Sequence, residues 1–151
     1  MTDICTKGLD LYALVDGEWR FVAPGRPSAD GVSTFTIAKN MTPVDREFML
    51  YLSMYDGVKS IEIGVDKGAY IEQPAVNSPS HEKPIVMYGS SILQGGCASR
   101  PGMAFTNIIA RRTDRTVFNL GFSGNALLDL EIAELMASVK DPGVFVLDYV
   151  P

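Results

Sequence analysis

The order of apolar and helical segments in the second part of the chain constrains the fold most. Three short apolar runs have the composition of strands buried on both faces: PIVMYG (84–89), TVFNLGF (116–122) and GVFVLDYV (143–150). Two stretches of helical character lie between them, residues 103–112 and 125–139. Parallel neighbours in a sheet need a long crossover, usually a helix, so this alternation predicts a parallel sheet with right-handed crossovers.

The longer helical stretch also predicts which of its faces is buried. Five apolar side chains recur along it at helical spacing: Leu128, Ile132, Leu135, Met136 and Val139. We expect this stripe to form the buried face of the helix.

The first part of the chain has a different pattern. Asp16-Gly17, between LDLYALV and EWRFVA, predicts a hairpin, because a type I′ turn needs positive φ at both central positions. Three further segments are short and rich in β-branched and aromatic residues: 33–38, 47–55 and 61–66. Alternation in the second of them assigns its even-numbered residues to a core face: Phe48, Leu50, Leu52 and Met54. These features predict an antiparallel sheet or half of a β-sandwich.

A proline-rich segment, QPAVNSPSHEKP, separates the two patterns. We therefore expect an antiparallel sheet or half of a β-sandwich over residues 1–74, a linker over 75–83 and an α/β portion over 84–151. The fold class is α/β, with an antiparallel β portion preceding a parallel sheet.

Composition excludes several classes of function. A net charge of −5 and a pI near 4.8 offer no general attraction to nucleic acid or to an anionic membrane. Cys5, Cys97 and His81 lack the spacing of a zinc site, and nothing else in the sequence implies a metal or an organic cofactor. The first residues do not resemble a signal peptide, and no apolar run reaches the roughly 18 to 20 residues that span a bilayer.

Small polar residues follow each of the three predicted parallel strands. They are Gly89-Ser90-Ser91, residues 121–125 and residues 149–151, and they meet at the sheet edge where ligands bind in such folds. A serine at a strand-to-helix turn can be an activated nucleophile, or it can only cap the helix. Gly121 and Gly124 can likewise serve an oxyanion loop, or only close packing and positive φ.

Nucleotide-binding motifs and the nucleophile elbow do not fit this edge. GSSILQGG lacks the Lys-Ser/Thr pair of a phosphate-binding loop, and GFSG does not match GxGxxG. Leu93 stands where the second glycine of a GxSxG elbow would be.

Four motifs together resemble one family. YGSSILQGGCASRPGM resembles the first block of the SGNH, or GDSL-like, hydrolases, with Gly89-Ser90-Ser91-Ile92 standing where the family has Gly-Asp-Ser-Leu. NLGFSGNA is similar to the second block, and VFVLDYVP to the strand that leads into the third. GLDLY, residues 8–12, resembles the signature of the β-sandwich domain that precedes the hydrolase in one bacterial subgroup.

The resemblance implies a flavodoxin-like three-layer α/β/α portion and roles for particular residues. Ser91 would be the nucleophile and its N–H an oxyanion donor, with the Gly124 N–H as a second donor. Asn119 would shape the loop after its strand or have a plain strand-end role. Arg100 would hold its loop or meet substrate, and structural support is the favoured interpretation.

Other family blocks have no counterpart in these 151 residues. The asparagine of the third block should follow Pro151, and the Asp-x-x-His block with the general base should come much later. His81 precedes the strand that delivers Ser91, and at ~3.3 Å per residue the two ends of that strand, residues 84–88, lie about 17 Å apart, so His81 is at the end away from Ser91. We therefore expect a chain truncated at both ends, in which the strand ending at Tyr149 has a bare edge that invites self-association or a partner chain.

The function expected from the resemblance is a serine esterase of SGNH type. Its substrate would be a small ester or an acylated carbohydrate, from which it would remove small acyl groups such as acetyl. The alternative is a non-catalytic module that binds glycan or protein, because the base is missing from these residues. Neither interpretation involves nucleic acid or membrane. The compartment stays unknown, although full-length relatives are often exported.

Overall fold

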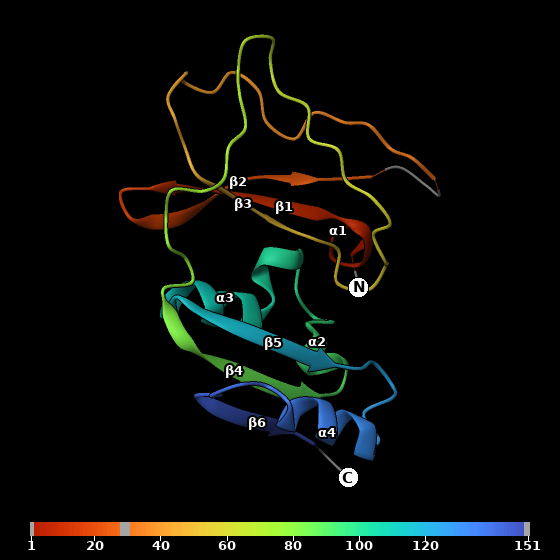
Figure 1. Ribbon diagram of the computed structural model, residues 1–151. Helices are drawn as coiled ribbons and strands as arrows, with labels where there is room; N and C mark the ends of the chain where they lie inside the picture. The colour runs from red at the N-terminus through yellow and green to blue at the C-terminus, as the bar shows by residue number, and fades with distance from the viewer. Residues whose placement is uncertain (1, 28–30, 150–151) are drawn as a thin grey trace.

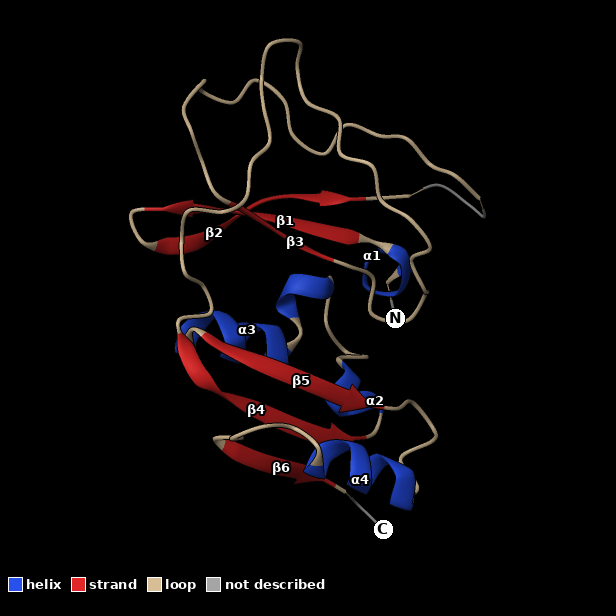
Figure 2. Cartoon of the chain, viewed as in Figure 1, coloured by secondary structure: helices blue, strands red, loops and turns tan. Residues whose placement is uncertain are grey.

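The computed structural model of the chain describes residues 2–27 and 31–149. An antiparallel sheet and a parallel sheet lie one above the other, and helices lie between them (Figure 1). The first sheet is preceded by a short helix, α1 (Asp3–Lys7). Its strands are β1 (Leu9–Val15), β2 (Glu18–Gly25) and β3 (Phe48–Tyr51), in the order β2-β1-β3. Long loops cover its outer face, the upper one in Figure 2.

The predicted hairpin is confirmed. β1 and β2 pair in antiparallel register and are joined at Asp16 and Gly17, whose φ values are 53° and 79°. Positive φ at both central positions is the type I′ geometry, which matches the twist of the two strands.

Two of the strands expected in the first half are absent from the structure, and a third is short. Residues 33–38 and 61–66 are irregular, and only Phe48–Tyr51 of the segment 47–55 is a strand. β-Branched composition favours a strand only when a neighbour supplies a ladder, and among the described residues β1 is the neighbour of β3. Ile63 lies in a segment without a neighbouring strand, and it is 64% exposed.

The predicted core face of segment 47–55 is wrong for Phe48 and Leu52, whereas Leu50 and Met54 are half-buried. Phe48 and Leu52 are 48% and 44% exposed. Tyr51, assigned to the other face, packs edge-on against Tyr12 with ring centroids 5.4 Å apart. The parallel half lies on this side of the sheet, so the position of a second layer decided which face was buried.

The parallel sheet has the predicted topology. β4 (His81–Gly89) is central, with β5 (Arg115–Gly121) and β6 (Val144–Asp148) parallel to it on either side. The helical segments are α2 (Ser91–Gln94), the 3-10 turn η1 (Pro101–Met103), α3 (Phe105–Thr113) and α4 (Leu130–Ala137). Within the described residues, none of the helices is long and apolar enough to cross a membrane.

The two faces of the parallel sheet carry different helices, which confirms the three-layer arrangement. Val86 and Tyr88 of β4 form a buried cluster with Met136 of α4. On the opposite face Asn119 of β5 donates a hydrogen bond to Thr106 of α3. Alternate residues along a strand point to opposite faces, so the odd and even positions meet different helices.

Some of the predicted burial in the parallel half is wrong. Leu128 has φ 60° and α4 begins only at Leu130, so Leu128 is 54% exposed; Leu135 is 52% exposed. Of the predicted stripe, Ile132, Met136 and Val139 do pack on the sheet. β6 is an edge strand with three exposed apolar side chains, not a strand buried on both faces: Val144, Phe145 and Leu147.

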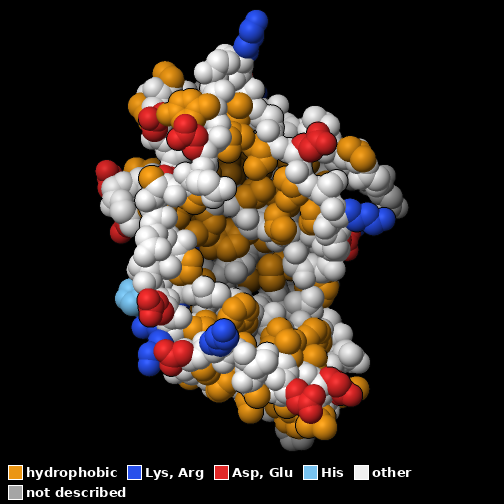
Figure 3. Space-filling view, viewed as in Figure 1, with side chains coloured by type: hydrophobic (Ala, Val, Ile, Leu, Met, Phe, Trp, Pro, Cys, Tyr) orange, Lys and Arg blue, Asp and Glu red, His pale blue; other side chains and the backbone are white. Residues whose placement is uncertain are grey.

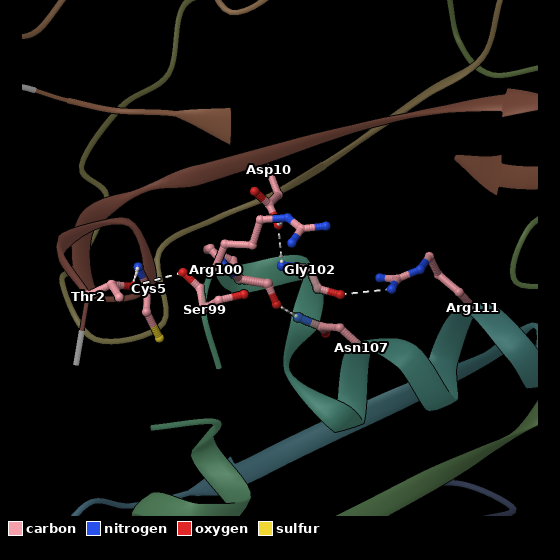
Figure 4. A network of polar contacts seen from close by, with 9 residues as sticks. Thr2, Cys5, Asp10, Ser99, Arg100, Gly102, Asn107 and Arg111 are labelled. Atoms are coloured by element: carbon pink, nitrogen blue, oxygen red, sulfur yellow. Dashed lines mark hydrogen bonds and ion pairs between the residues drawn. The ribbon is translucent and has the colours of Figure 1, made fainter. Parts of the chain in front are cut away.

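A joint between the two halves is centred on Asp10 of the GLDLY segment (Figure 4). This carboxylate is fully buried. Its Oδ2 accepts a hydrogen bond of 2.8 Å from the Gly102 N–H and lies 3.1 Å from Nε of Arg100. The Arg100 guanidinium stacks 4.1 Å from the centroid of Phe21, and Arg111 donates to the Gly102 carbonyl at 2.8 Å.

Opposing effects act on the Asp10 carboxyl. Burial raises its pKa above the ordinary value, whereas the Gly102 N–H and the guanidinium groups of Arg100 and Arg111 oppose that rise. The partners from the parallel half therefore stabilise the buried carboxylate of Asp10. Through these contacts the joint connects β1 of the antiparallel half to η1 of the parallel half.

Candidate active site

The two serines at the end of β4 have different roles. Ser90 is the N-cap of α2, and its Oγ accepts a hydrogen bond from the Ile92 N–H at 3.4 Å. Ser91 is the first residue of the helix. Within the described part of the chain its hydroxyl has no hydrogen-bond partner, and it lines a cavity. The capping interpretation therefore applies to Ser90, which leaves the Ser91 hydroxyl available.

The loop after β5 reaches the same edge of the sheet. Gly89 and Gly121 are paired in the parallel register, and the Phe122 N–H donates to the Gly89 carbonyl at 2.8 Å. The Ser123 N–H donates to the side chain of Gln94, and the Asn125 N–H closes a turn onto Phe122.

Hydrogen bonding in this loop singles out one N–H group. The N–H groups of Gly121, Phe122, Ser123 and Asn125 all have acceptors, and among the described residues Gly124 has none for its own. A backbone N–H without an internal partner at a ligand-binding edge is available to an anion.

The two glycines of this loop are there for different reasons. A side chain at Gly121 would lie 2.3 Å from the Gln94 nitrogen, so this position allows α2 to pack on β5. Gly124 has open space around it but a φ of +67°, a left-handed conformation that glycine adopts at little cost.

Asn119 shapes the edge of the sheet at which β4 and β5 end. Its Oδ1 accepts from the Gly121 N–H at 2.9 Å, and its Nδ2 donates to the Leu93 carbonyl at 3.1 Å and to Thr106 at 3.0 Å. It therefore joins β5 to α2 and α3. Arg100 lies in the joint and pairs with Asp10, a contact of the structural kind that the sequence analysis favoured.

The cavity at Ser91 has a volume of about 260 Å³. It is lined by residues from both halves of the chain: Tyr55, Ser91, Ile92, Gly96, Cys97 and Ser123. The sequence did not predict that Tyr55 lines this cavity. The alternation of residues within 47–55 does not indicate which end of the parallel strands this segment approaches. Another hollow, of about 400 Å³, lies beside α1 and contains none of the predicted site residues.

His81 lies at the opposite end of β4 from Ser91, as predicted. It is the first residue of the strand, whereas Ser91 follows the last. Its Nδ1 is 3.3 Å from the Asp114 carbonyl oxygen. General-base catalysis needs contact of about 3 Å with the nucleophile, so His81 does not serve Ser91.

Comparison with known families agrees with this geometry. Residues 82–151 match the GDSL-like lipase/acylhydrolase family. The second half of the chain is therefore similar to this family. Residues 1–71 match the family described as the N-terminus of SGNH-hydrolase-type esterases, which is named after the GxDLY signature. The family resemblance drawn from the sequence motifs is thereby confirmed.

A solved structure supports the same assignment for the fold. The chain is similar to the crystal structure of a protein assigned as a GDSL-like lipase from Bacteroides ovatus, with a TM-score of 0.89 and 43% sequence identity. The similarity covers 99% of this chain and 43% of that protein, so the chain spans less than half the length of its relative. A search of curated proteins found no match.

Proposed function

We propose that the protein containing these residues is a serine ester hydrolase with Ser91 as its nucleophile. The observation that carries the proposal is the Ser91 hydroxyl, which has no partner among the described residues and faces a cavity beside the loop of Gly124. The N–H groups of Ser91 and Gly124 are the proposed oxyanion donors. Ser91 is the first residue of α2, and the first N–H groups of a helix have no acceptor within it.

The proposed reaction passes through an acyl-enzyme. Oγ of Ser91 attacks the ester carbonyl carbon while a general base removes the hydroxyl proton, and the carbonyl oxygen gains charge facing the two N–H groups. The tetrahedral intermediate collapses, the alcohol leaves with a proton, and the acyl group stays on Oγ. Water then attacks the acyl-enzyme and releases the acid. The family resemblance assigns the base to a histidine other than His81.

The proposed substrates are small acyl esters, including O-acetyl groups on carbohydrate. The short acyl group is proposed from the family resemblance, because the cavity beside Ser91 is an open hollow of about 260 Å³ that does not limit the length of the acyl group. The carbohydrate part rests on family resemblance alone. No metal or organic cofactor takes part in the proposed reaction.

The experiment that tests this function compares two neighbouring serines in the longest natural chain that carries these residues. Ser91→Ala should lower kcat/KM for p-nitrophenyl acetate by about 10⁴-fold or more, because the nucleophile is lost. Ser90→Ala should lower it by less than about tenfold, because it removes a helix cap worth about 1 kcal/mol. Turnover that survives Ser91→Ala would contradict the proposal.

A non-catalytic binding module is the second candidate. The observation that favours it is the position of His81, the single histidine of this sequence, away from Ser91. Two results together would support this candidate over the esterase. The folded chain would bind an acetylated oligosaccharide in isothermal titration, and its longest natural form would show no turnover that depends on Ser91.

Self-association at the edge of β6 is also proposed. Its apolar side chains are exposed, with Leu147 at 65%, and Figure 3 shows apolar atoms gathered at this end of the molecule. Light scattering tests it, and a monodisperse monomer at about 100 µM would contradict it. The division into residues 1–74, 75–83 and 84–151 stays a prediction; limited proteolysis should first cut within 75–80.

A further inference from the structure

Gln94, the last residue of α2, connects the antiparallel half to the loop of Gly124. Its Nε2 donates a hydrogen bond of 3.0 Å to the carbonyl of Met54. Its Oε1 accepts a hydrogen bond of 3.0 Å from the N–H of Ser123. Because one partner is an acceptor and the other a donor, the two contacts together define one orientation of the amide.

The Met54 carbonyl is itself held in place. The Met54 N–H donates to the Cys5 carbonyl at 3.2 Å, and the Cys5 thiol donates to the Gly95 carbonyl at 3.7 Å. The next residue, Tyr55, lines the cavity with Ser91. The segment that anchors Gln94 is therefore part of the wall of the site.

The contact with Ser123 lies one residue before the proposed oxyanion donor. Holding the Ser123 N–H constrains the backbone that leads into Gly124, whose own N–H has no acceptor among the described residues. Without Gln94, the Ser123 N–H would lose its acceptor and the loop would lose one of the hydrogen bonds that set its position. A shift of about 1 Å in a donor can cost about 10²-fold in rate.

We propose that Gln94 is a positioning residue, which holds the Gly124 loop against Ser91 and is oriented by the carbonyl of Met54. This inference rests on the proposed function. It assigns the antiparallel half a part in the reaction, through Met54 and the cavity wall at Tyr55, although the nucleophile and both proposed donors lie in the parallel half.

The test uses two variants that separate the contacts. Gln94→Met has similar length and loses both hydrogen bonds, whereas Gln94→Glu keeps an acceptor for Ser123 but sets a carboxylate oxygen against the Met54 carbonyl. Gln73→Met is the matched control, because Gln73 is exposed on a loop. All are made in the longest natural chain and assayed with p-nitrophenyl acetate.

Gln94→Met should lower kcat by about 10- to 100-fold with KM within about threefold, because a donor misplaced in the transition state affects kcat most. Gln94→Glu should lower kcat by less than Gln94→Met but by more than Gln73→Met. A Gln94→Met enzyme with the kcat of the control would overturn the role of Gln94. Equal kcat in Gln94→Glu and the control would overturn the part assigned to Met54.

Failure of this inference is distinguishable from failure of the proposed function. If Ser91→Ala abolishes turnover and Gln94→Met does not reduce it, the esterase stands and the positioning role is wrong. If turnover survives Ser91→Ala, the esterase itself is wrong. A merely structural role would lower the unfolding midpoint of Gln94→Met without the selective loss of kcat, so urea unfolding accompanies the kinetics.

Discussion

The parallel half follows its sequence pattern more closely than the antiparallel half. All three apolar runs predicted after residue 83 form strands, and these pair in parallel as predicted. In the first half, residues 33–38 and 61–66 have equally suitable composition and form no strand. Each β-α-β unit contains both the next strand and the helix that covers it, whereas an antiparallel segment needs a ladder partner from elsewhere.

The antiparallel half compensates through contacts with its neighbour. Asp10 and Tyr12 of β1 are buried, and their partners include Arg100 and Arg111 of the parallel half. The small sheet therefore depends on the joint, whereas the parallel sheet has its own cluster under α4. Four substitutions test this difference.

Asp10→Ala should have the largest effect. It leaves Arg100 and the Gly102 N–H without their buried acceptor, and breaking a buried pair costs about 3 kcal/mol or more. Urea unfolding measures the loss, with exposed Asp66→Ala as the control. If the antiparallel half depends on the joint, its aromatic circular-dichroism signal should be lost first in the variant. An unchanged midpoint would refute the dependence.

Gly102→Ala should cost about 2 kcal/mol, because overpacking a well-packed contact typically costs 1–3 kcal/mol. A methyl group at this position would lie 2.5 Å from a ring carbon of Tyr12 and 2.8 Å from Oδ2 of Asp10. Gly57→Ala is the matched control, since nothing lies within 4 Å of its added carbon. Equal unfolding free energies for the two variants would show that the contacts around Gly102 rearrange at little cost.

Asp114→Asn tests a second contact region, where the loop before β4 meets Asp114 just before β5. We expect a smaller effect there. Hydrogen bonds from Ser80 and Ser78 lower the pKa of the Asp114 carboxyl below its ordinary value of 3.8. A lowered pKa in the folded state stabilises the fold above pH 3.8, and this contribution is lost as the pH falls through the folded value.

Since Asp114 is near the surface, the loss in Asp114→Asn should stay below about 1 kcal/mol at pH 7. Unfolding free energies of the two proteins, measured from pH 7 downwards, should converge at pH values below 3.8. A difference that grows as the pH falls would contradict the assigned direction of the pKa shift.

Ile63→Ser should have the smallest effect, below about 0.5 kcal/mol, because an exposed side chain away from any special contact contributes little. Ile63 lies in the predicted strand that did not form and is 64% exposed. Met136→Ala, in the buried cluster, should cost about 2 kcal/mol or more as the reference. Comparable losses would mean that residues 61–66 pack more closely than the structure indicates, which would weaken the contrast between the halves.

The part of the candidate site that could be predicted consists of residues that directly follow a parallel strand. Ser91 and residues 121–125 follow from one rule, that parallel strands end at a common edge. The position of Tyr55 and the contacts of Gln94 could not be predicted, because they join distant residues through loops without a regular pattern; Gln94 is 40 positions from Met54 and 29 from Ser123. Residue type alone does not distinguish Ser90 from Ser91, and it was the family resemblance that favoured Ser91 as the nucleophile; the backbone then places Ser90 at the N-cap of α2.

The sequence by itself determined the features whose cause is local or covalent. The turn at Asp16-Gly17 depends on the φ preferences of two residues, and the parallel order depends on the helices that connect the strands. Tertiary structure alone decided the burial of Asp10, the requirement for glycine at position 102 and the orientation of Gln94. Each of these depends on a partner distant in sequence, and local preferences carry no information about where such a partner lies.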